Sequence, residues 1–409
     1  MSYCKTVERC VKLIKNEVKN TPLQYSTRLS YKYNCNVYLK REDLQNTRSF
    51  KIRGATNKIK NLYNKNELRN GITCASAGNH AQGVAYICNK LKINGTIFLP
   101  KTTPLQKINR IEYFGGQYIN IIKHSNTVDN CLEKSKEIAK ENYLCFVHPF
   151  DDLDIIDGQA TVGLEIMNKF NPDIVLCPVG GGGLISGVSK YMKSINDSIN
   201  IIGVEPLGAC SLYNSINNNK ITTFNNIDTF VDGASIAKIG NKTFDICKQN
   251  IDHIELISNE HLCYNLIDIY QNDGIILEPA GALSIAALDN LNDKQNIEGK
   301  NIVCILSGGN NDLTRYDEIM DLSLKYQNLK HYFIVEFSQS PGQLKMFINN
   351  ILGKNDDIIR FEYLKKTNRD YGKVLIGIEL KHKEDLKNIV YNLEKYNFKY
   401  TKVEKSDLI

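Results

Sequence analysis

A run of four glycines is the part of this sequence whose residue types point most directly to chemistry. It follows the apolar run Asp173–Pro178 and precedes a helix that we expect to start near Leu184, and its members are Gly180, Gly181, Gly182 and Gly183. Residues without side chains let successive backbone N–H groups converge on an anion, and a helix N-terminus adds a partial positive charge. The run therefore predicts a phosphate site.

Two nucleotide-binding motifs come close to this run and would give it a different meaning. The P-loop needs a lysine where Val188 stands, so that interpretation is excluded. The dinucleotide fingerprint, counted from Gly181, has Ser186 in place of its third glycine, but Glu205 ends the next expected strand about 20 residues later. A dinucleotide-dependent oxidoreductase therefore stays open as an alternative, although it leaves the motifs described next without a role.

Lys51 is the second candidate, because its neighbours are apolar. A lysine at the start of a helix is usually exposed to solvent, but Phe50, Ile52 and Ala55 flank this one. Such a setting removes water from the ammonium group and lowers its pKa, which is what a lysine that forms a Schiff base requires.

Two further stretches of small residues complete the set of candidates. Ser76–Gly83 is a loop before an expected helix; its N–H groups suit a carboxylate, and Asn79 could donate to a phenolate oxygen. Taken alone, His80 is more typical of a structural residue at a helix start than of a base. Ser307–Asn310, with sequence Ser-Gly-Gly-Asn, follows directly after the expected strand that begins at Asn301.

The elements that must position these residues alternate between short strands and amphipathic helices up to about Leu322. The first helix should end at Thr21-Pro22 and carries apolar residues at helical spacing, namely Val7, Val11, Ile14 and Val18. Short apolar runs followed by turns are expected to be strands, among them Gly95–Pro100, Asp173–Pro178, Ile201–Glu205 and Asn301–Ser307. This alternation predicts parallel α/β architecture.

The pattern changes after about Lys330. The expected order is strand, helix, strand, strand, helix, strand over His331–Phe337, Leu344–Leu352, Asp357–Tyr363, Lys373–Leu380, Leu386–Tyr396 and Phe398–Val403, with a turn at 368–372. This βαββαβ order is the ferredoxin-like plan. We therefore predict two domains, 1–325 and 330–409, with a small subdomain at about 50–155 inserted in the first.

Composition and charge exclude several classes of protein. Apolar residues make up 42% of the chain and charged residues 23%, which is typical of a globular protein with a core. Lys and Arg exceed Asp and Glu by only 51 to 45, without a basic block, so we expect no nucleic-acid partner. The 12 cysteines are scattered, which favours core thiols in a reducing compartment. No stretch of about 18 apolar residues occurs, so we expect a cytoplasmic protein and no membrane partner.

Taken together, the four motifs resemble the fold-type-II pyridoxal-phosphate family, which includes threonine and serine dehydratases, serine racemase and the tryptophan synthase β chain. The resemblance spans about residues 20 to 325 and is strongest to the biosynthetic threonine dehydratases. It also rests on Lys40–Ala55, His148–Glu165, Val231–Ala234 and Glu278–Ala282. The C-terminal region resembles the ACT-like regulatory module of that group, chiefly in Phe337–Gly342 and Asp357–Lys366. The fold implied is a tryptophan synthase β-like pair of open parallel-sheet α/β subdomains followed by the ferredoxin-like domain.

The resemblance implies a role for each candidate residue. The cofactor would be pyridoxal 5'-phosphate, held covalently by Lys51, which would also take the Cα proton of the substrate. Phe50 would pack beside the ring, Asn79 would hydrogen-bond the 3-oxygen, and Ser307 would face the pyridine nitrogen. The phosphate would bind Gly180, Gly181, Gly182, Gly183 and Leu184 through backbone N–H groups. The substrate carboxylate would lie at Ser76, Gly78 and His80.

The implied activity is the dehydration and deamination of L-threonine to 2-oxobutanoate and ammonia, the first step of isoleucine biosynthesis. A serine hydroxyl at position 307 cannot hold a proton on the pyridine nitrogen as a carboxylate would, which suits prompt loss of the β-hydroxyl and not transamination. L-Serine is an expected second substrate, because one methyl group changes specificity by only about 10- to 200-fold.

Other functions within and outside the family remain alternatives. Serine racemases place a serine where this chain has Ala77, which argues against racemisation. The cation site of that subgroup fits Glu205 and Ala209 but not Ser211, so no metal ligand is assigned. A catabolic serine/threonine dehydratase that isoleucine does not inhibit is one alternative, and a catalytically inactive amino-acid sensor is another.

The C-terminal domain implies regulation by small molecules. By resemblance, isoleucine should inhibit and valine should oppose it, whereas a domain used only for oligomerisation is the alternative. The family favours homodimers and homotetramers, and the sequence does not choose between them.

Overall fold

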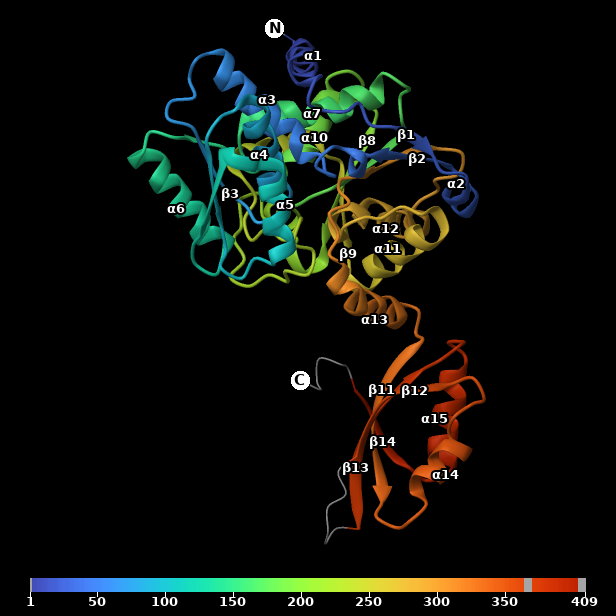
Figure 1. Cartoon of the computed structure of the whole chain (residues 1–409). Helices are drawn as coiled ribbons and strands as arrows, with labels where there is room; N and C mark the ends of the chain where they lie inside the picture. Colours follow the sequence, from blue (N-terminus) through green and yellow to red (C-terminus); the bar gives the residue numbers. More distant parts are fainter. Residues whose placement is uncertain (1, 364–369, 404–409) are drawn as a thin grey trace. The chain divides into compact units, whose positions relative to one another are not determined.

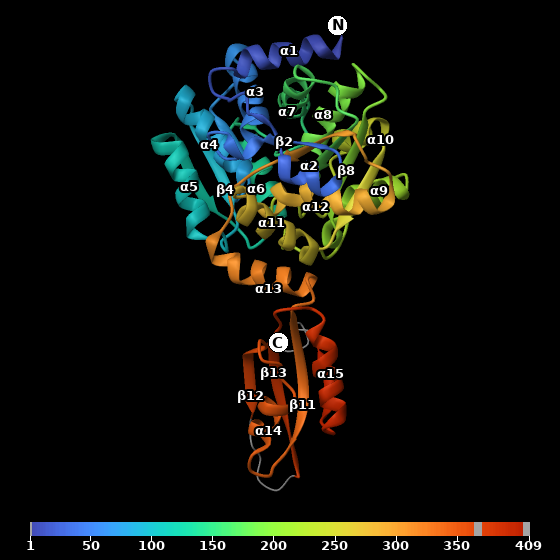
Figure 2. The same ribbon diagram turned by 90° about the vertical axis from the view of Figure 1, so that its right-hand side faces the viewer.

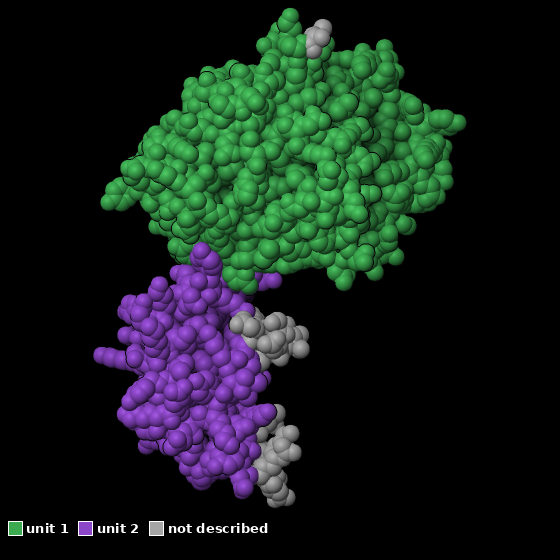
Figure 3. All heavy atoms as spheres, turned by 180° about the vertical axis from the view of Figure 1, so that it is seen from behind, with its two compact units in different colours: residues 1–312 green, residues 313–409 purple. Residues whose placement is uncertain are grey.

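The chain folds as two units in this computed structural model, Met1–Asp312 and Leu313–Ile409 (Figure 3). All residues are described except Met1, 364–369 and 404–409. The helix α13 (Tyr316–Tyr326) and the short 3-10 helix η4 (Leu313–Arg315) belong to the second unit. The sequence analysis placed this segment at the end of the first domain.

The first unit contains a six-stranded sheet with the order β1-β2-β10-β7-β8-β9. The strands are β1 (Leu23–Tyr25), β2 (Asn36–Arg41), β10 (Asn301–Leu306), β7 (Ile174–Pro178), β8 (Asn200–Pro206) and β9 (His253–Ile257). All neighbours are parallel except β1, which pairs antiparallel with β2 at the edge. Apart from Asn301, the central strands β7 and β10 are apolar and buried, as expected for parallel strands covered on both faces.

Helices cover both faces of this sheet. α12 (Pro279–Lys294) packs on β7, β8, β9 and β10, and α11 (Asn259–Asp273) lies against α12 (Figures 1 and 2). α8 packs on β7 and belongs with a second group of mutually packed helices. That group comprises α1 (Tyr3–Ile14), α7 (Leu153–Met167), α8 (Gly183–Lys193), α9 (Ser211–Asn217) and α10 (Asn241–Asn250). The short helices α2 (Thr27–Tyr33), η1 (Glu42–Leu44) and η3 (Leu207–Ala209) lie between strands and helices of this part of the chain.

The first helix is shorter than its apolar spacing suggested. The expected helix reached Val18, but α1 ends at Ile14 and a turn follows. Val18 is nevertheless buried and packs with Ile14 and Ile52. The spacing therefore reported the burial of Val18 correctly and its helical conformation wrongly.

A second, four-stranded parallel sheet has the order β5-β4-β3-β6. Its strands are β3 (Ile72–Ala75), β4 (Gly95–Leu99), β5 (Ile119–Lys123) and β6 (Cys145–Phe146). α6 (Val128–Glu141) and α4 (Asn79–Leu91) pack on its strands, and α4 also contacts α5 (Leu105–Gly115), which η2 (Gly116–Tyr118) follows. These elements lie within the expected small subdomain of about 50–155.

One helix connects the two sheets. α3 (Lys51–Asn64) packs against α4 of the small sheet and against α7 of the large one. The α3–α7 contact is close, since a Cβ added to Gly158 would lie 2.7 Å from the Cα atom of Gly54. The first turn of α3 is therefore held by both halves of the unit.

The second unit has the βαββαβ order that the sequence predicts. Its elements are β11 (Lys330–Ser338), α14 (Gln343–Asn350), β12 (Asp357–Tyr363), β13 (Tyr371–Glu379), α15 (Asp385–Lys395) and β14 (Lys399–Val403). The antiparallel sheet has the order β12-β13-β11-β14. Figure 2 shows α15 beside this sheet, and Phe337, Phe347 and Phe398 pack together in the core. Part of the expected turn at 368–372 and the end of the stretch Asp357–Lys366 lie outside the described residues.

Two global properties follow from the described part of the chain. No helix within it is long and apolar enough to cross a membrane. All 12 cysteines are free thiols and ten of them are buried, which agrees with the interpretation as core residues.

Candidate active site

Lys51 is the first residue of α3, and its side chain is partly buried. The Nζ atom donates a hydrogen bond of 2.8 Å to the carbonyl oxygen of Pro149 and lies 5.4 Å from the ring centre of Phe50. Burial lowers the pKa of the amine from 10.5 to about 8, and the nearby carboxyl of Glu278 partly opposes this change. The amine can therefore lose its proton near neutral pH, as the sequence predicts for this lysine.

The four-glycine run connects β7 to α8, and its positions require glycine. A Cβ added to Gly180 would lie 2.9 Å from the Cα atom of Ala234, and one added to Gly181 would lie 2.3 Å from the ring of Phe150. Gly182 has a φ of +85°, a conformation that favours glycine. α8 begins at Gly183, one residue before the expected start, and Leu184 is buried in its first turn. The N–H groups of such a first turn have no partner within the helix.

A second chain segment fixes the shape of this loop. The Thr243 hydroxyl donates to the carbonyl oxygen of Gly181 at 2.8 Å. Thr243 lies in the first turn of α10, where the carboxylate of Asp151 accepts hydrogen bonds from the N–H groups of residues 241, 242 and 243. Asp151 thus supports the glycine loop through Thr243, which the sequence gave no reason to expect.

The segment 147–150 joins the separate motifs. The carbonyl oxygen of Val147 lies 3.0 Å from Nε2 of His80, and that of Pro149 accepts from Lys51. The Phe150 ring packs on the glycine loop. His148 shapes the segment, because its Nδ1 atom accepts from the N–H groups of Phe150 and Asp151. The family resemblance includes the chain from His148 onward, but the sequence does not predict these contacts.

The loop Ser76–Gly83 places Asn79 and His80 at the start of α4. The Ser76 hydroxyl accepts a hydrogen bond from the Gly78 N–H group at 3.2 Å. A side chain on Gly78 would meet no atom within 4 Å, so the loop borders open space. His80 is buried, and its Nδ1 atom has no hydrogen-bond partner among the described residues. Burial and the charge of Lys51 lower the pKa of His80 to about 3, so its ring is neutral.

Glu278 is a residue of this site that the sequence analysis did not assign. It precedes Pro279 at the start of α12, and its Oε1 atom accepts a hydrogen bond of 2.6 Å from Nδ2 of Asn79. Burial, with the charge of Asp232, raises the pKa of its carboxyl to about 7, against the opposing effects of Asn79 and Lys51. The available signal was an acidic residue directly before a proline at the start of an apolar helix.

Ser307 lies at the carboxyl end of β10, beside the start of α3. Its hydroxyl donates to the carbonyl oxygen of Ala280 at 3.3 Å, and its own carbonyl oxygen accepts from the Phe50 N–H group at 3.1 Å. An isolated bridge between Ser49 and Gly308 extends this contact. The structure thus brings Ser307 next to Phe50 and Lys51, although more than 250 residues separate them in the chain.

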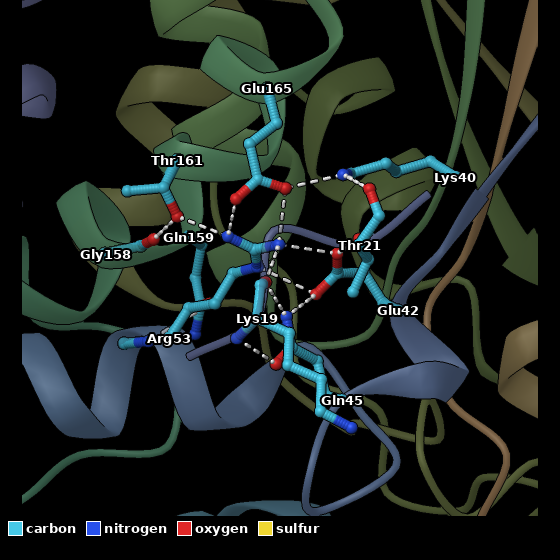
Figure 4. Close-up of polar contacts among 11 residues, drawn as sticks. Lys19, Thr21, Lys40, Glu42, Gln45, Arg53, Gly158, Gln159, Thr161 and Glu165 are labelled. Carbon is cyan, nitrogen blue, oxygen red and sulfur yellow. Dashed lines mark hydrogen bonds and ion pairs between the residues drawn. The ribbon is translucent and has the colours of Figure 1, made fainter. Parts of the chain in front are cut away.

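A buried ionic cluster holds the first turn of α3 (Figure 4). Arg53 forms paired hydrogen bonds of 2.8 Å with the carboxylates of Glu42 and Glu165. The Lys40 amine donates to Glu165 at 2.5 Å and to the carbonyl oxygen of Thr21 at 2.7 Å. Two cations and two carboxylates therefore balance inside the protein, and they tie α3 to β2, η1 and α7.

Of the three positions compared with the cation site of the racemase subgroup, only Glu205 carries an acidic side chain. The Glu205 carboxylate accepts hydrogen bonds from the N–H groups of Leu212 and Tyr213, at 2.9 and 2.8 Å. Ala209 ends η3, and the Ser211 hydroxyl is buried without a partner among the described residues. Within the described part of the chain, no three or more His, Cys, Asp or Glu residues are grouped so that they could hold a metal ion.

Comparison with known families identifies both parts of the chain. Residues 14–308 match the profile of the family "Pyridoxal-phosphate dependent enzyme". Residues 321–409 match the profile "C-terminal regulatory domain of Threonine dehydratase".

Individual relatives agree with these two matches. The biosynthetic L-threonine dehydratase IlvA of Halalkalibacterium halodurans is 48% identical over 96% of this chain and 95% of its own. That of Staphylococcus epidermidis is 50% identical over 93% of this chain and 91% of its own. Among solved structures, threonine deaminase isoform 2 of Solanum lycopersicum superposes with a TM-score of 0.75 at 36% identity, covering 78% of this chain and 88% of that one. Maize serine racemase gives 0.72 at 30% identity, covering 79% and 98%.

Proposed function

The chain belongs to the family of pyridoxal-phosphate-dependent enzymes, and we propose that it removes water and ammonia from L-threonine with Lys51 as the residue that holds the cofactor. The products are 2-oxobutanoate and ammonia, and the reaction begins isoleucine biosynthesis. The assignment of Lys51 is carried by the position of its amine, which donates to the carbonyl oxygen of Pro149 and lies near the carboxyl of Glu278, the partner of Asn79.

The residues of the pocket fit this cofactor. The glycine loop and the first turn of α8 offer backbone N–H groups for a phosphate, and no side chain fits at Gly180 or Gly181. The Asn79 amide supplies a donor, and the Ser307 hydroxyl lies between the loop after β10 and α12. When bound, pyridoxal phosphate withdraws electrons from the substrate Cα atom.

Lys51 acts as the base in this proposal. With its pKa lowered to about 8, a large enough fraction of the amine is neutral near pH 7 to accept the Cα proton. The carbonyl oxygen of Pro149 accepts a hydrogen bond from the amine and so fixes its position at the start of α3. Phe50 limits water on one side of it.

Ser307 directs the reaction toward elimination. A neutral hydroxyl cannot hold a proton on a pyridine nitrogen as an aspartate would, so negative charge at Cα is short-lived. Prompt departure of the β-hydroxyl meets that requirement, whereas amino-group transfer does not. In this structure the hydroxyl is buried and donates weakly, at 3.3 Å, to Ala280.

The substrate carboxylate lies at the loop of Ser76, Gly78 and His80 in this proposal. The open space beside Gly78 leaves room for a ligand, and the start of α4 favours negative charge. The unpaired Nδ1 atom of His80 is a further polar group that a ligand or a water molecule could satisfy.

The assignment of Lys51 is tested by product formation. Lys51→Ala should abolish the release of 2-oxobutanoate from L-threonine, whereas Lys58→Ala should retain it. Lys58 is a matched control, because it lies on the same helix and forms ion pairs with Asp152 and Asp154. Unchanged activity of Lys51→Ala would exclude the proposed role.

L-Serine is proposed as a slower substrate. It differs from threonine by one methyl group, and a contact of that size changes kcat/KM by about 10- to 200-fold. Pyruvate release from L-serine at a kcat/KM within this range is the expected result.

For the second unit we propose allosteric regulation of threonine turnover. Its fold and its match to a regulatory domain support an amino-acid effector, with isoleucine as inhibitor and valine as its antagonist. Saturating isoleucine should raise the KM for threonine in the full chain, and valine should reverse the change. Threonine kinetics that isoleucine leaves unaltered would contradict regulation and favour the catabolic alternative.

We further propose a homodimer or homotetramer in the cytoplasm. Light scattering on the eluting peak of a size-exclusion column distinguishes these two states from each other and from a monomer of 46.4 kDa.

A further inference from the structure

We propose that Asn310 is a positioning residue, which sets the orientation of the Asn79 amide and thereby ensures that Asn79 offers the cofactor a hydrogen-bond donor. The inference rests on the proposed function, in which Asn79 contacts the ring oxygen of pyridoxal phosphate. Asn310 itself makes no contact with the cofactor in this account.

Both hydrogens of the Asn310 amide are in use. Its Nδ2 atom donates to the carbonyl oxygen of Thr47 at 2.8 Å and to Oδ1 of Asn79 at 2.7 Å. A backbone carbonyl can only accept a hydrogen bond, so the nitrogen of Asn310 must face Thr47. The backbone carbonyl of Thr47 therefore fixes the orientation of the Asn310 amide.

The backbone around this contact is itself well held. The Gly309 N–H group donates to the carbonyl oxygen of Arg48 at 2.8 Å, and Ser49 forms an isolated bridge with Gly308. A Cβ on Gly309 would lie 2.8 Å from the carbonyl oxygen of Ile276. Backbone hydrogen bonds thus hold residues 47–49 and 308–310 together, and they fix the position of the Asn310 side chain.

The orientation of Asn79 follows from that of Asn310. Its Oδ1 atom accepts from Asn310, so its Nδ2 atom faces Glu278, whose Oε1 atom accepts at 2.6 Å. If the Asn79 amide were reversed, its NH₂ group would face the NH₂ group of Asn310, and its oxygen would face the carboxyl oxygen of Glu278. One N–H of the Asn79 amide remains free to donate, while the Oδ1 atom faces Asn310.

A donor in this place has a definite consequence. The ring oxygen of pyridoxal phosphate carries negative charge, and a hydrogen bond to a charged group contributes more than one between neutral groups. An amide turned by half a rotation would present its oxygen to that charge and repel it. Asn310 therefore determines whether Asn79 attracts or repels the ring oxygen, although Asn310 does not contact the cofactor.

The test is a series of variants at position 310 in the full chain. In Asn310→Asp, the carboxylate can only accept, so Asn79 must turn its nitrogen toward it and its oxygen toward the cofactor. We expect the affinity for pyridoxal phosphate to fall roughly 10- to 100-fold, from loss of one charge-assisted hydrogen bond. Asn310→Ala frees the Asn79 amide to adopt either orientation and should give a smaller loss than Asn310→Asp.

Two readouts besides activity separate positioning from a structural role. The first is the dissociation constant of pyridoxal phosphate, measured by titrating cofactor-free protein. The second is the absorbance band above about 400 nm and its pH dependence, which report the surroundings of the ring oxygen. Asn311→Asp is the matched control, since Asn311 is the next residue in the chain and donates to the carbonyl oxygen of Leu277. It should leave both readouts close to the wild type.

The expected order of affinity is wild type and Asn311→Asp, then Asn310→Ala, then Asn310→Asp. Equal affinity and an unchanged absorbance band in Asn310→Ala and Asn310→Asp would overturn the inference, as would equal losses in the variants of Asn310 and Asn311. If Asn310→Asp does not fold, the comparison of Asn310→Ala with Asn311→Asp decides. A wild-type protein without the band would refute the proposed function instead, so the two failures are distinguishable.

Discussion

Lys51 and Arg53 lie two residues apart on α3, yet their surroundings act on positive charge in opposite ways. Arg53 faces the ionic cluster, where Glu42 and Glu165 each bind its guanidinium through two oxygens. Burial alone would lower the pKa of Arg53, but these two carboxylates raise it above its ordinary value. Lys51 faces the pocket, where burial dominates and lowers the pKa of its amine to about 8.

The carboxylates of the two regions differ in the same way. Burial alone would raise the pKa of Glu42, but the charge and hydrogen bonds of Arg53 keep it below its ordinary value. In the pocket, burial raises the pKa of Glu278 to about 7, because Asn79 and the nearby cations compensate only in part. Arg53 and Glu42 thus stay ionised, whereas Lys51 and Glu278 can exchange protons near neutral pH.

The difference shows how one helix serves both stability and chemistry. A buried charge with complete partners is fixed in place and unreactive, whereas a buried amine with one carbonyl partner is reactive and poorly compensated. Because the i and i+2 positions of a helix point to opposite sides, the cluster can anchor α3 without entering the pocket.

The largest expected effect comes from breaking the cluster. Arg53→Leu leaves Glu42 and Glu165 buried without their main counter-ion, and removal of one partner of a buried pair costs about 3–5 kcal/mol. We expect that loss in the free energy of unfolding, measured by urea denaturation of the cofactor-free protein. Arg360→Leu is the control, since its exposed pair with Glu362 should contribute less than about 1 kcal/mol. Equal losses in both variants would mean that the cluster does not stabilise the fold.

A smaller effect should follow from removing the titration of Glu278. The pKa of Glu278 is raised from 4.5 to about 7 in the folded state. The stabilisation that its protonated form gives to the fold is therefore fully present below pH 4.5 and is lost as the pH rises through about 7. The loss is on the order of 3 kcal/mol by linkage. Glu278→Gln should therefore be more stable, relative to the wild type, at pH 8 than at pH 4.5. Paired unfolding curves of the cofactor-free proteins at the two pH values measure this, and a constant difference would show that Glu278 does not titrate in this range.

The smallest effect concerns the glycine loop. Gly182→Ala and Gly299→Ala both place a side chain on a backbone with positive φ, which costs about 1–2 kcal/mol of stability in each. Only the Cβ of Gly182→Ala meets close neighbours, at 2.9 Å from Thr243 and Ile239. We expect roughly tenfold weaker binding of pyridoxal phosphate in Gly182→Ala and unchanged binding in Gly299→Ala. Equal affinities in a fluorescence titration would remove the loop from the binding site.

Much of the fold was accessible from the sequence, because its signals are local. β12 has the predicted bounds, Asp357–Tyr363, and the glycine run lies between a strand and a helix as expected. The alternation of strands and helices gave the parallel sheets, although the antiparallel edge strand β1 is too short for its pairing to be predicted. The helical spacing of Val18 gave a wrong prediction, because Val18 is buried but lies beyond the end of α1.

The parts that the sequence could not give depend on contacts between distant residues. Lys51 was recognisable from its apolar neighbours, but its partner Pro149 lies 98 residues away and Asn310 lies 231 residues from Asn79. No local pattern specifies which carbonyl or carboxylate such a group will meet. The role of Glu278 was hidden for the same reason, and so was the pairing of Arg53 with Glu165.

The central claim is that Lys51, and not another lysine, holds the cofactor. Borohydride reduction of the protein with bound pyridoxal phosphate, followed by proteolysis and mass spectrometry, locates the modified residue directly. We predict a single phosphopyridoxyl group on the peptide that contains Lys51. The same label on Lys40 or Lys58 and none on Lys51 would contradict the account.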